Sequence, residues 1–330
     1  AELAALIGSQ TALSNRNLVI NGNMEVAQRG TSHTTAGYGS LDRFQLALSG
    51  GTATMSQESF TVGQTDVPGS EKYLRCNVSV GNNNAGVYHM IEAQNVLPAI
   101  GGKVTLSYYA KGTSPTDGLN VKVAWYDGSA GANATAQVVT LTSSWVKYTH
   151  TFTTPSISGL NLASLNTNAR LEISWLQKGS DTGTAAFDLN LAQVQLEVGE
   201  QATPFEHRSF HDELRRCKRY FERFAKTLTS VGQNSEANCG LWSGMSRSGN
   251  SGNNQGVMTY QTKRTNPSIS VSSAAHINGV FPIFPFAASL SSFGIDGNAG
   301  IDNCFVNAAN NASTAPSSDC GSSGVMGDSS

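Results

Sequence analysis

Aromatic and polar side chains at alternating positions are the clearest candidates for chemistry in this chain. Tyr and Trp rings stack on the apolar C–H faces of sugars, while Lys, Asp, Asn and Gln hydrogen-bond the hydroxyl groups. Tyr109, Lys111 and Tyr126 fall on the wet faces of predicted strands. Trp145 and Trp175 are aromatics of undetermined side, and Trp175 alternates with aliphatic residues, which is more typical of a core. These five residues are the predicted glycan contacts.

Motifs for catalysis or metal binding are absent from the sequence. The histidines are scattered, and only His207 and His211 share i, i+4 spacing, without a His-Glu-x-x-His motif. The five cysteines form no Cys-x-x-Cys pair, which favours free thiols, with a Cys304–Cys320 bridge as an alternative. We expect no enzyme activity, no cofactor and no metal. A carboxylate pair brought together by folding would leave glycan hydrolysis open.

Composition favours many short strands and tight turns. Charged residues make up 13% of the 330 residues, Gly occurs 34 times, and the net charge is −2. This balance gives no bias towards nucleic acid or a membrane, and no apolar run reaches the length of a membrane-spanning helix. Because the chain starts at Ala1, we interpret it as a piece of a longer or processed protein whose missing part lies upstream.

Residues 17–206 are predicted to form one antiparallel β-sandwich of the jelly-roll type. Apolar residues alternate with polar ones in several segments separated by Gly-rich turns, as expected for strands with one buried face. The clearest sets are Val104, Leu106 and Tyr108; Val121, Val123 and Trp125; and Leu171, Ile173 and Trp175. A last strand containing Phe187 to Leu196 has a predicted bulge at Ala192-Gln193.

A connecting amphipathic helix is predicted within residues 207–226, from about Ser209 to Ala225. Ser209 starts a Ser-x-x-Asp capping pattern. The apolar stripe of this helix has the spacing of a coiled-coil seam and consists of Leu214, Cys217, Phe221 and Phe224. It would pack either on its own β-domain or on other copies in a trimer, and we favour the trimer interface. The basic residues opposite it are interpreted as a solvated face.

The two ends of the chain differ from this centre. Residues 1–16 carry Leu3, Leu6, Ile7 and Leu13 near heptad spacing, which predicts a short helix, either alone or as the end of a stalk. Residues 227–330 are rich in Gly, Ser and Asn with isolated apolar strands, which predicts a small second β-sandwich. The segment 298–318 would supply its receptor-contacting loops, or would be a flexible tail.

Two strings resemble bacteriophage tail fibre and receptor-binding proteins that contain a jelly roll like those of carbohydrate-binding modules. They are VQLEVGEQATPFEHRSFHDELRRCKRYFERF, residues 194–224, and LVINGNMEVAQRGTS, residues 18–32, followed by Asp42-Arg43-Phe44. Related modules often hold a structural calcium with an acidic residue in the first strand and an Asp in the last. Glu25 fits the first position, but Ala192 stands near the second, with Asp188 nearby, so we expect no calcium.

The resemblance implies a trimeric virion protein, assembled in the host cytoplasm, that attaches to host cell-surface polysaccharide or lipopolysaccharide. Its N-terminus would join other phage tail proteins, and three weak sites would act together. Two alternatives stay open at this point. One is a tailspike that depolymerises glycan, and the other is a structural collar or adaptor protein without glycan affinity.

Overall fold

The structure is a computed structural model that describes residues 15–80, 85–158, 160, 169–177, 186–223, 242–246, 253–271, 290–295, 303–310 and 324–327. The chain forms two compact units, residues 1–217 and 218–330. The predicted N-terminal helix falls almost entirely outside the described residues, as does Phe224. Within the predicted loop 298–318, residues 303–310 form a strand and the rest lies outside the described part.

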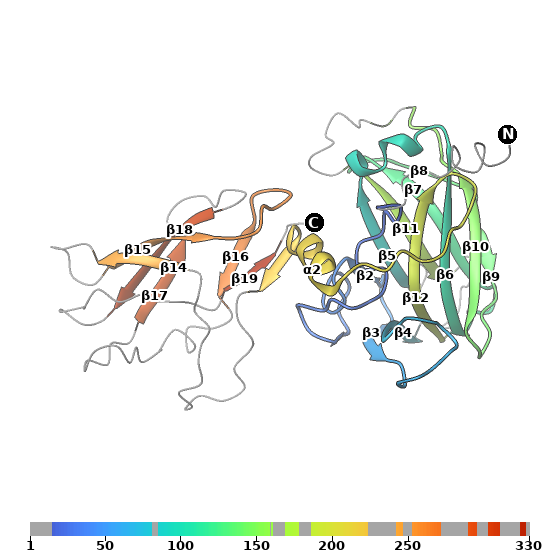
Figure 1. Ribbon diagram of the computed structural model, residues 1–330, viewed down its shortest axis with the longest axis horizontal. Helices are drawn as coiled ribbons and strands as arrows, with labels where there is room; N and C mark the ends of the chain where they lie inside the picture. Colours follow the sequence, from blue (N-terminus) through green and yellow to red (C-terminus); the bar gives the residue numbers. More distant parts are fainter. Residues whose placement is uncertain are drawn as a thin grey trace. The chain divides into compact units, whose positions relative to one another are not determined.

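The first unit is built from two antiparallel sheets, which Figure 1 shows as the layers of a sandwich. Sheet A has the order β1 (Ser32–His33), β3 (Thr52–Ser59), β4 (Lys72–Val80), β12 (Phe187–Val198), β6 (Lys103–Thr113) and β10 (Val146–Thr153). Sheet B has the order β2 (Phe44–Ala47), β5 (Gly86–Glu92), β11 (Arg170–Gln177), β7 (Leu119–Tyr126) and β8 (Gly131–Asn133), with β9 (Gln137–Val139) also on β7. Two short 3-10 turns, η1 (Ala93–Asn95) and η2 (Leu97–Ala99), connect β5 to β6.

The predicted alternation produces the core between these sheets. Tyr108 on β6, Trp125 on β7 and Trp175 on β11 are completely buried, together with the aliphatic residues that share their faces. Burying such side chains is worth about 25 cal/mol per Å² of apolar surface, which is the main driving force for the sandwich. The predicted fold class, mainly β with antiparallel sheets and a helix after the jelly roll, is confirmed.

The predicted bulge in β12 is also confirmed, and the backbone around Gly22 packs against it. The register of β12 against β6 shifts between Ala192 and Gln195, and Gln193 has a φ of 47°. The Val194 backbone N–H donates to the Gly22 carbonyl at 2.9 Å. A Cβ on Gly22 would lie 2.2 Å from the Val194 carbonyl oxygen, so only glycine allows this approach.

One titratable side chain is buried in the core of the sandwich. His89 on β5 is 1% exposed and lies 4.8 Å from the Phe44 ring between centroids. Burial, and after it the Arg43 cation, holds the pKa of His89 well below its ordinary value of 6.5. His89 is therefore neutral in the folded state.

We predict that stability falls with acid because of His89. Below pH 6.5 the unfolded chain takes up a proton at this residue that the folded chain does not, so the free energy of unfolding should fall by about 1.4 kcal/mol per pH unit. His89→Phe should remove the His89 share of this slope, leaving the smaller shares of His33 and His150, whose pKa values burial also lowers, while the exposed control, His211→Gln, should keep the full slope. Guanidinium unfolding at pH 7.5 and 5.0 measures the change in the free energy of unfolding with pH. Equal changes in the two variants would contradict the prediction.

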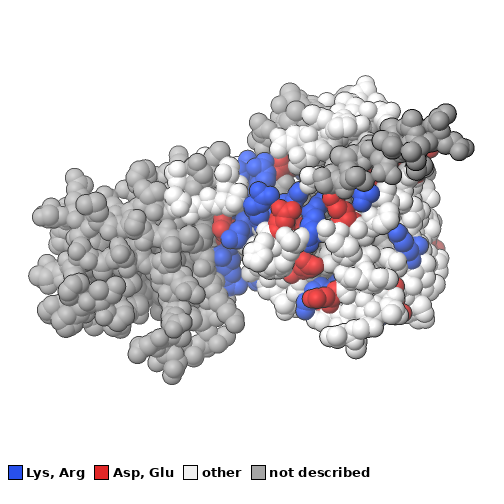
Figure 2. Space-filling view, in the orientation of Figure 1, with Lys and Arg blue, Asp and Glu red and all other residues white. Residues whose placement is uncertain are grey.

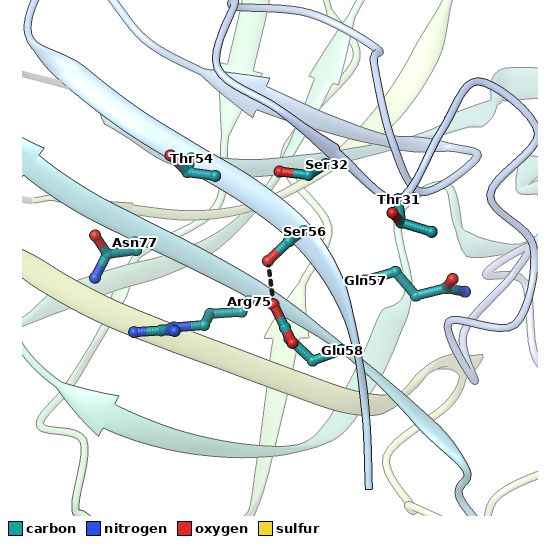
Figure 3. Close-up of a pocket in the computed structure, with 8 residues that line it drawn as sticks. All are labelled: Thr31, Ser32, Thr54, Ser56, Gln57, Glu58, Arg75 and Asn77. Carbon is teal, nitrogen blue, oxygen red and sulfur yellow. Dashed lines mark hydrogen bonds between the residues drawn. The ribbon is translucent and has the colours of Figure 1, made fainter. Parts of the chain in front are cut away.

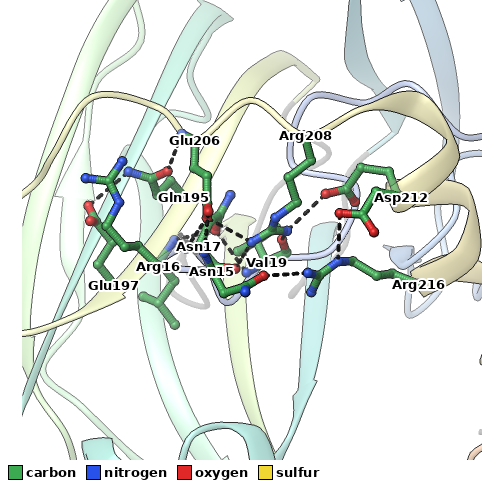
Figure 4. Close-up of polar contacts among 12 residues, drawn as sticks. Asn15, Arg16, Asn17, Val19, Gln195, Glu197, Glu206, Arg208, Asp212 and Arg216 are labelled. Carbon is green, nitrogen blue, oxygen red and sulfur yellow. Dashed lines mark hydrogen bonds and ion pairs between the residues drawn. The ribbon is translucent and has the colours of Figure 1, made fainter. Parts of the chain in front are cut away.

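The chain after β12 folds back on the strand that it leaves. Thr203 donates to the Glu197 carboxylate from its backbone N–H at 2.9 Å and from its hydroxyl at 2.6 Å. Gln195 accepts from the Glu206 backbone N–H at 2.8 Å, and Figure 4 shows these two residues facing each other. The Gln-Leu-Glu part of the long motif thus hydrogen-bonds its own Ala-Thr-Pro-Phe-Glu continuation.

Arg208 joins this returning segment to the start of the sandwich and to the helix. Its side chain is 6% exposed and donates to the Val19 carbonyl at 3.1 Å, to Glu213 at 2.9 Å, to Glu206 at 3.1 Å and to the Asn17 carbonyl. Figure 4 shows the converging groups around Arg208. We call Asn17, Glu206, Arg208 and Glu213 the Arg208 latch.

The two carboxylates of the Arg208 latch also receive backbone hydrogen bonds. Glu206 accepts from the Asn17 N–H at 2.8 Å. Burial alone would raise the pKa of Glu206, but this hydrogen bond and the Arg208 cation lower it. Glu213 accepts from the Asn21 N–H, and the Asn21 amide donates to the Asp42 carbonyl at 2.9 Å. Both strings that resemble tail fibre proteins therefore meet in one buried polar network.

The helix is shorter than its sequence pattern predicts. Helix α2 (Phe210–Lys218) begins with the expected cap, since the Asp212 N–H donates to the Ser209 hydroxyl at 3.2 Å. It ends before Phe221, which belongs to β13 (Phe221–Arg223) and pairs with Gly327. Strand pairing with a residue far along the chain overrides the local helical periodicity, so the predicted last turns are wrong.

This difference breaks up the predicted helical stripe. Leu214 and Cys217 lie on α2, Phe221 lies on a strand, and Phe224 lies outside the described residues. Cys217 is 1% exposed within this single chain. The four residues do not form one helical seam, and a trimer interface at this stripe stays a prediction that the single chain does not test.

Charged residues on α2 pair locally, as predicted for a solvated face. Arg215 donates to Asp212 at 2.9 Å, and this hydrogen bond is the main cause of the lowered pKa of Asp212. Arg216 lies 3.9 Å from Asp212 and donates to Asn15 at 2.6 Å. Figure 2 shows Lys and Arg interspersed with Asp and Glu around this helix. No helix in the described part of the chain is long and apolar enough to cross a membrane.

The second unit contains two further antiparallel sheets. One has the order β13, β19 (Gly324–Gly327) and β16 (Ser268–Val271), and the other has the order β14 (Trp242–Ser246), β15 (Asn253–Thr259), β18 (Asn303–Asn310) and β17 (Leu290–Ile295). Lys263 is buried here and donates to Glu222 at 2.7 Å. The turn at residues 263–267, Lys-Arg-Thr-Asn-Pro, thereby contributes a buried ion pair to the second unit.

Candidate functional site

Polar side chains line up across the face of sheet A that points away from the core. Strand register places Ser56 of β3 opposite Arg75 of β4, Arg75 opposite Asn190 of β12, and Asn190 opposite Lys111 of β6. Neighbouring residues such as Leu74 and Leu191 are fully buried on the other side. Because side chains alternate along a strand, these four residues share the outer face of sheet A.

Three aromatic rings meet over this outer face. The Tyr73 ring lies 4.8 Å from Phe60 and 5.4 Å from Trp145 between centroids, and Phe60 lies 5.2 Å from Trp145. The three side chains come from β4, from the residue after β3 and from the residue before β10. Each is partly exposed. We call Phe60, Tyr73 and Trp145 the aromatic platform.

A polar groove of about 510 Å³ adjoins the platform at the β1, β3 and β4 side of the sheet. Its lining is almost entirely hydroxyl, amide and charged groups, contributed by Thr31, Ser32, Thr54, Ser56, Gln57, Glu58, Arg75 and Asn77. Figure 3 shows Ser56 donating to Glu58, a hydrogen bond of 2.6 Å. Such a lining can exchange hydrogen bonds with several hydroxyl groups of one ligand.

An ion pair lies between the groove and the platform. The Arg75 guanidinium contacts both oxygens of Asp188 on β12, with Nε 3.0 and 3.2 Å and Nη2 3.1 Å away. Hydrogen bonding to Asp188 raises the pKa of Arg75. Burial, and then the Glu58 charge, raises the pKa of Tyr73, so its hydroxyl remains a donor at neutral pH. The site thus offers fixed polar groups next to apolar rings.

Comparisons with protein-family models and with curated proteins give no match. Solved structures with similarity include a family 4 carbohydrate-binding module, at 18% identity over 55% of this chain and 99% of the module, with a TM-score of 0.33. The N-terminal cellulose-binding domain of Cellulomonas fimi β-1,4-glucanase C is 21% identical over 45% of this chain and 90% of that domain, with a TM-score of 0.29.

A phage protein is also similar. The enzymatically active domain of tailspike protein 4 from bacteriophage CBA120 is 13% identical over 56% of this chain, with a TM-score of 0.35, and the chain covers 22% of that domain. The structural neighbours are thus carbohydrate-binding modules and a tailspike domain. Because these TM-scores lie below 0.5, the function proposed below rests on the side chains of this chain.

The structure brings together three of the five predicted glycan contacts. Trp145 belongs to the aromatic platform, Lys111 lies beside it, and Tyr109 occupies the same outer face of sheet A, opposite Ala192. Tyr126 lies on the outer face of sheet B, where Arg170 stacks 4.2 Å from its ring centroid. Trp175 has no exposed surface and packs edge-on against Tyr108 in the core, so its assignment as a glycan contact is wrong.

The groove and two of the three platform residues, Phe60 and Tyr73, were not identified from the sequence. Tyr73, Arg75 and Asn77 alternate with Leu74, Cys76 and Val78 in the segment Lys72–Val80. This alternation is as regular as that of the strands that were recognised, so the signal was present. The sequence pattern did not indicate that Phe60 and Trp145, which belong to other segments, contact the Tyr73 ring.

The residues considered for calcium have other partners. Glu25 accepts a hydrogen bond from the Asn23 amide at 2.7 Å, and Asp188 is paired with Arg75. Within the described residues, no three His, Cys, Asp or Glu side chains gather as they do at metal sites. Glu25 and Asp188 are thus hydrogen-bonded to other side chains of the same chain.

Proposed function

We propose that this chain is a phage tail fibre or receptor-binding protein that binds host cell-surface polysaccharide or lipopolysaccharide on the outer face of sheet A, without cleaving it. The observation that carries the proposal is the partly exposed aromatic platform beside a hydroxyl-lined groove. A cluster of partly exposed rings is typical of a binding site, and sugars combine an apolar face with a hydroxyl rim. The resemblance of residues 18–32 and 194–224 to tail fibre proteins supports the phage assignment.

At this face the aromatic rings would contact the sugar ring, and the polar groups would contact its hydroxyl groups. A sugar ring packs against Trp145 and Tyr73, and its hydroxyl groups replace water on Ser56, Asn77 and the Arg75 guanidinium. The Arg75–Asp188 pair holds both groups in a fixed orientation before the ligand arrives, which lowers the entropy cost of binding. A shallow face of this kind gives a weak single site.

Attachment would become tight through several copies. We propose a homotrimer on the strength of the resemblance, with residues 1–16 leading to other tail proteins, assembly in the host cytoplasm and a final location on the virion. Once one site is engaged, the others bind at a high effective concentration, so affinity rises by about 10²–10⁴ without new contacts.

Three measurements on the whole chain test this proposal. Light scattering should give a mass near three chains, and fluorescently labelled protein should bind host cells and be displaced by their purified polysaccharide. Incubation with that polysaccharide should release no reducing ends, whereas release would favour the depolymerase alternative. A monomer that does not bind host cells would contradict the proposal and favour a structural virion part.

A further inference from the structure

Lys111 places a positive charge at the aromatic platform, and no carboxylate of the described residues pairs with it. Its ammonium lies 5.1 Å from the Trp145 ring centroid and 5.9 Å from that of Tyr73, as in a cation–π contact. Among the described residues it forms no ion pair, and the residue is partly exposed. The rings hold the charge in place without neutralising it.

The acidic residues of the same face are already engaged. Asp188, one row away from Lys111 on β12, uses both of its oxygens for Arg75. Glu58 on β3 pairs in register with Tyr73 on β4 and accepts from Ser56 at 2.6 Å. The cation of Arg75 is therefore balanced by Asp188, whereas Lys111 has no carboxylate partner among the described residues.

A second lysine extends this basic area. Lys147 on the edge strand β10 is exposed and pairs in register with Tyr109, which is two residues before Lys111 on β6. The outer face of sheet A thus has a half at β1, β3 and β4 lined by hydroxyl and amide groups together with Glu58 and Arg75, and a basic half at β6 and β10. A ligand lying across the face would meet the aromatic platform between the two halves.

We infer that the ligand is an acidic glycan, in which the carboxylate of a uronic-acid-type sugar pairs with Lys111 while the ring packs against Trp145. This inference rests on the proposed glycan binding and narrows its ligand class. A carboxylate on a sugar ring is a compact anion at the rim of an apolar face, which matches an ammonium fixed beside an indole. An ion pair at a partly desolvated site is worth more than one in open water, and salt weakens it.

The test compares glycans that differ only in charge. An array of neutral and uronate-containing bacterial polysaccharides is probed with the whole chain, and each bound glycan is retested after chemical reduction of its carboxyl groups to alcohols. We expect the bound glycans to be acidic, and reduction to lower the affinity about tenfold or more. Lys111→Met should cause a similar loss and Lys111→Arg should largely restore binding, whereas Lys122→Met on the outer face of sheet B should bind like the parent chain.

The outcomes separate this inference from the proposed function. Binding that depends on Trp145 but is unchanged by carboxyl reduction, or by Lys111→Met, would overturn the acidic ligand and leave glycan binding intact. Failure to bind any glycan on the array would overturn the proposed function itself. Unfolding curves of the lysine variants establish that any loss of binding is not a loss of fold.

Discussion

Replacing Arg208 by Met should lower the free energy of unfolding of the first unit by about 3–5 kcal/mol. The substitution keeps most of the aliphatic stem but leaves Glu206 and Glu213, whose side chains are 12% and 7% exposed, without their cation. It also removes the donors to the Asn17 and Val19 carbonyls. Guanidinium unfolding monitored through the buried Trp125 and Trp175 would measure the change.

The matched control is Arg215→Met on the exposed side of α2. Arg215 also donates to a carboxylate, that of Asp212, but its side chain is 67% exposed, so its loss should cost about 1 kcal/mol or less. If both variants lost the same small amount of stability, the Arg208 latch would not be a structural element, and its motif would need another explanation.

Replacing Trp145 by Ala should lower the affinity for host glycan about 30-fold or more, the loss expected when a central aromatic contact is removed. Trp145 touches Phe60, Tyr73 and Lys111, so its removal opens the platform and releases the ammonium that it holds. Isothermal titration calorimetry with purified host polysaccharide would measure the change. Because Trp145 is not in the core, the unfolding free energy should change far less than for a core tryptophan.

Tyr126→Ala is the matched control for this experiment. Tyr126 is also a partly exposed ring next to a cation, since Arg170 lies 4.2 Å from its centroid, but it is on the outer face of sheet B. Its removal should leave affinity within about twofold, a change of roughly 0.4 kcal/mol. The reverse result, with Tyr126 required and Trp145 dispensable, would move the site to the other sheet.

The sandwich was predictable because strand burial leaves a period of two in the sequence. Val121, Val123 and Trp125 alternate with polar or small residues, and all three are fully buried. The bulge of β12 was visible as an interruption of the same alternation at Ala192-Gln193. The helix end was not predictable in this way, because Phe221 continues the helical spacing but pairs in a strand with residue 327.

The site was only half predictable because it depends on register between distant strands. Lys111 and Trp145 stood out as single residues, yet their neighbour Tyr73 comes from a strand that β12 separates from β6. Nothing in local spacing specifies that order of strands. The sequence also did not determine which face of the sheet Trp175 occupies. It lies in the core, where it alternates like its aliphatic neighbours.

The recognised motifs have a structural explanation that the sequence did not supply. Four polar residues of the long string, Gln195, Glu197, Glu206 and Arg208, hydrogen-bond to the backbone or to other side chains at the end of the sandwich. None of them lines the polar groove or the aromatic platform. The resemblance therefore describes how a jelly roll is joined to the helix that follows it, and the ligand is specified by other residues.

The most direct test of the central claim is a crystal structure of the chain with an oligosaccharide from its host polysaccharide. We predict a sugar ring against Trp145 and Tyr73, with hydroxyl groups directed to the groove at Ser56 and Arg75. Sugar bound on the outer face of sheet B, or only to residues 218–330, would contradict the assignment of the outer face of sheet A as the glycan-binding surface.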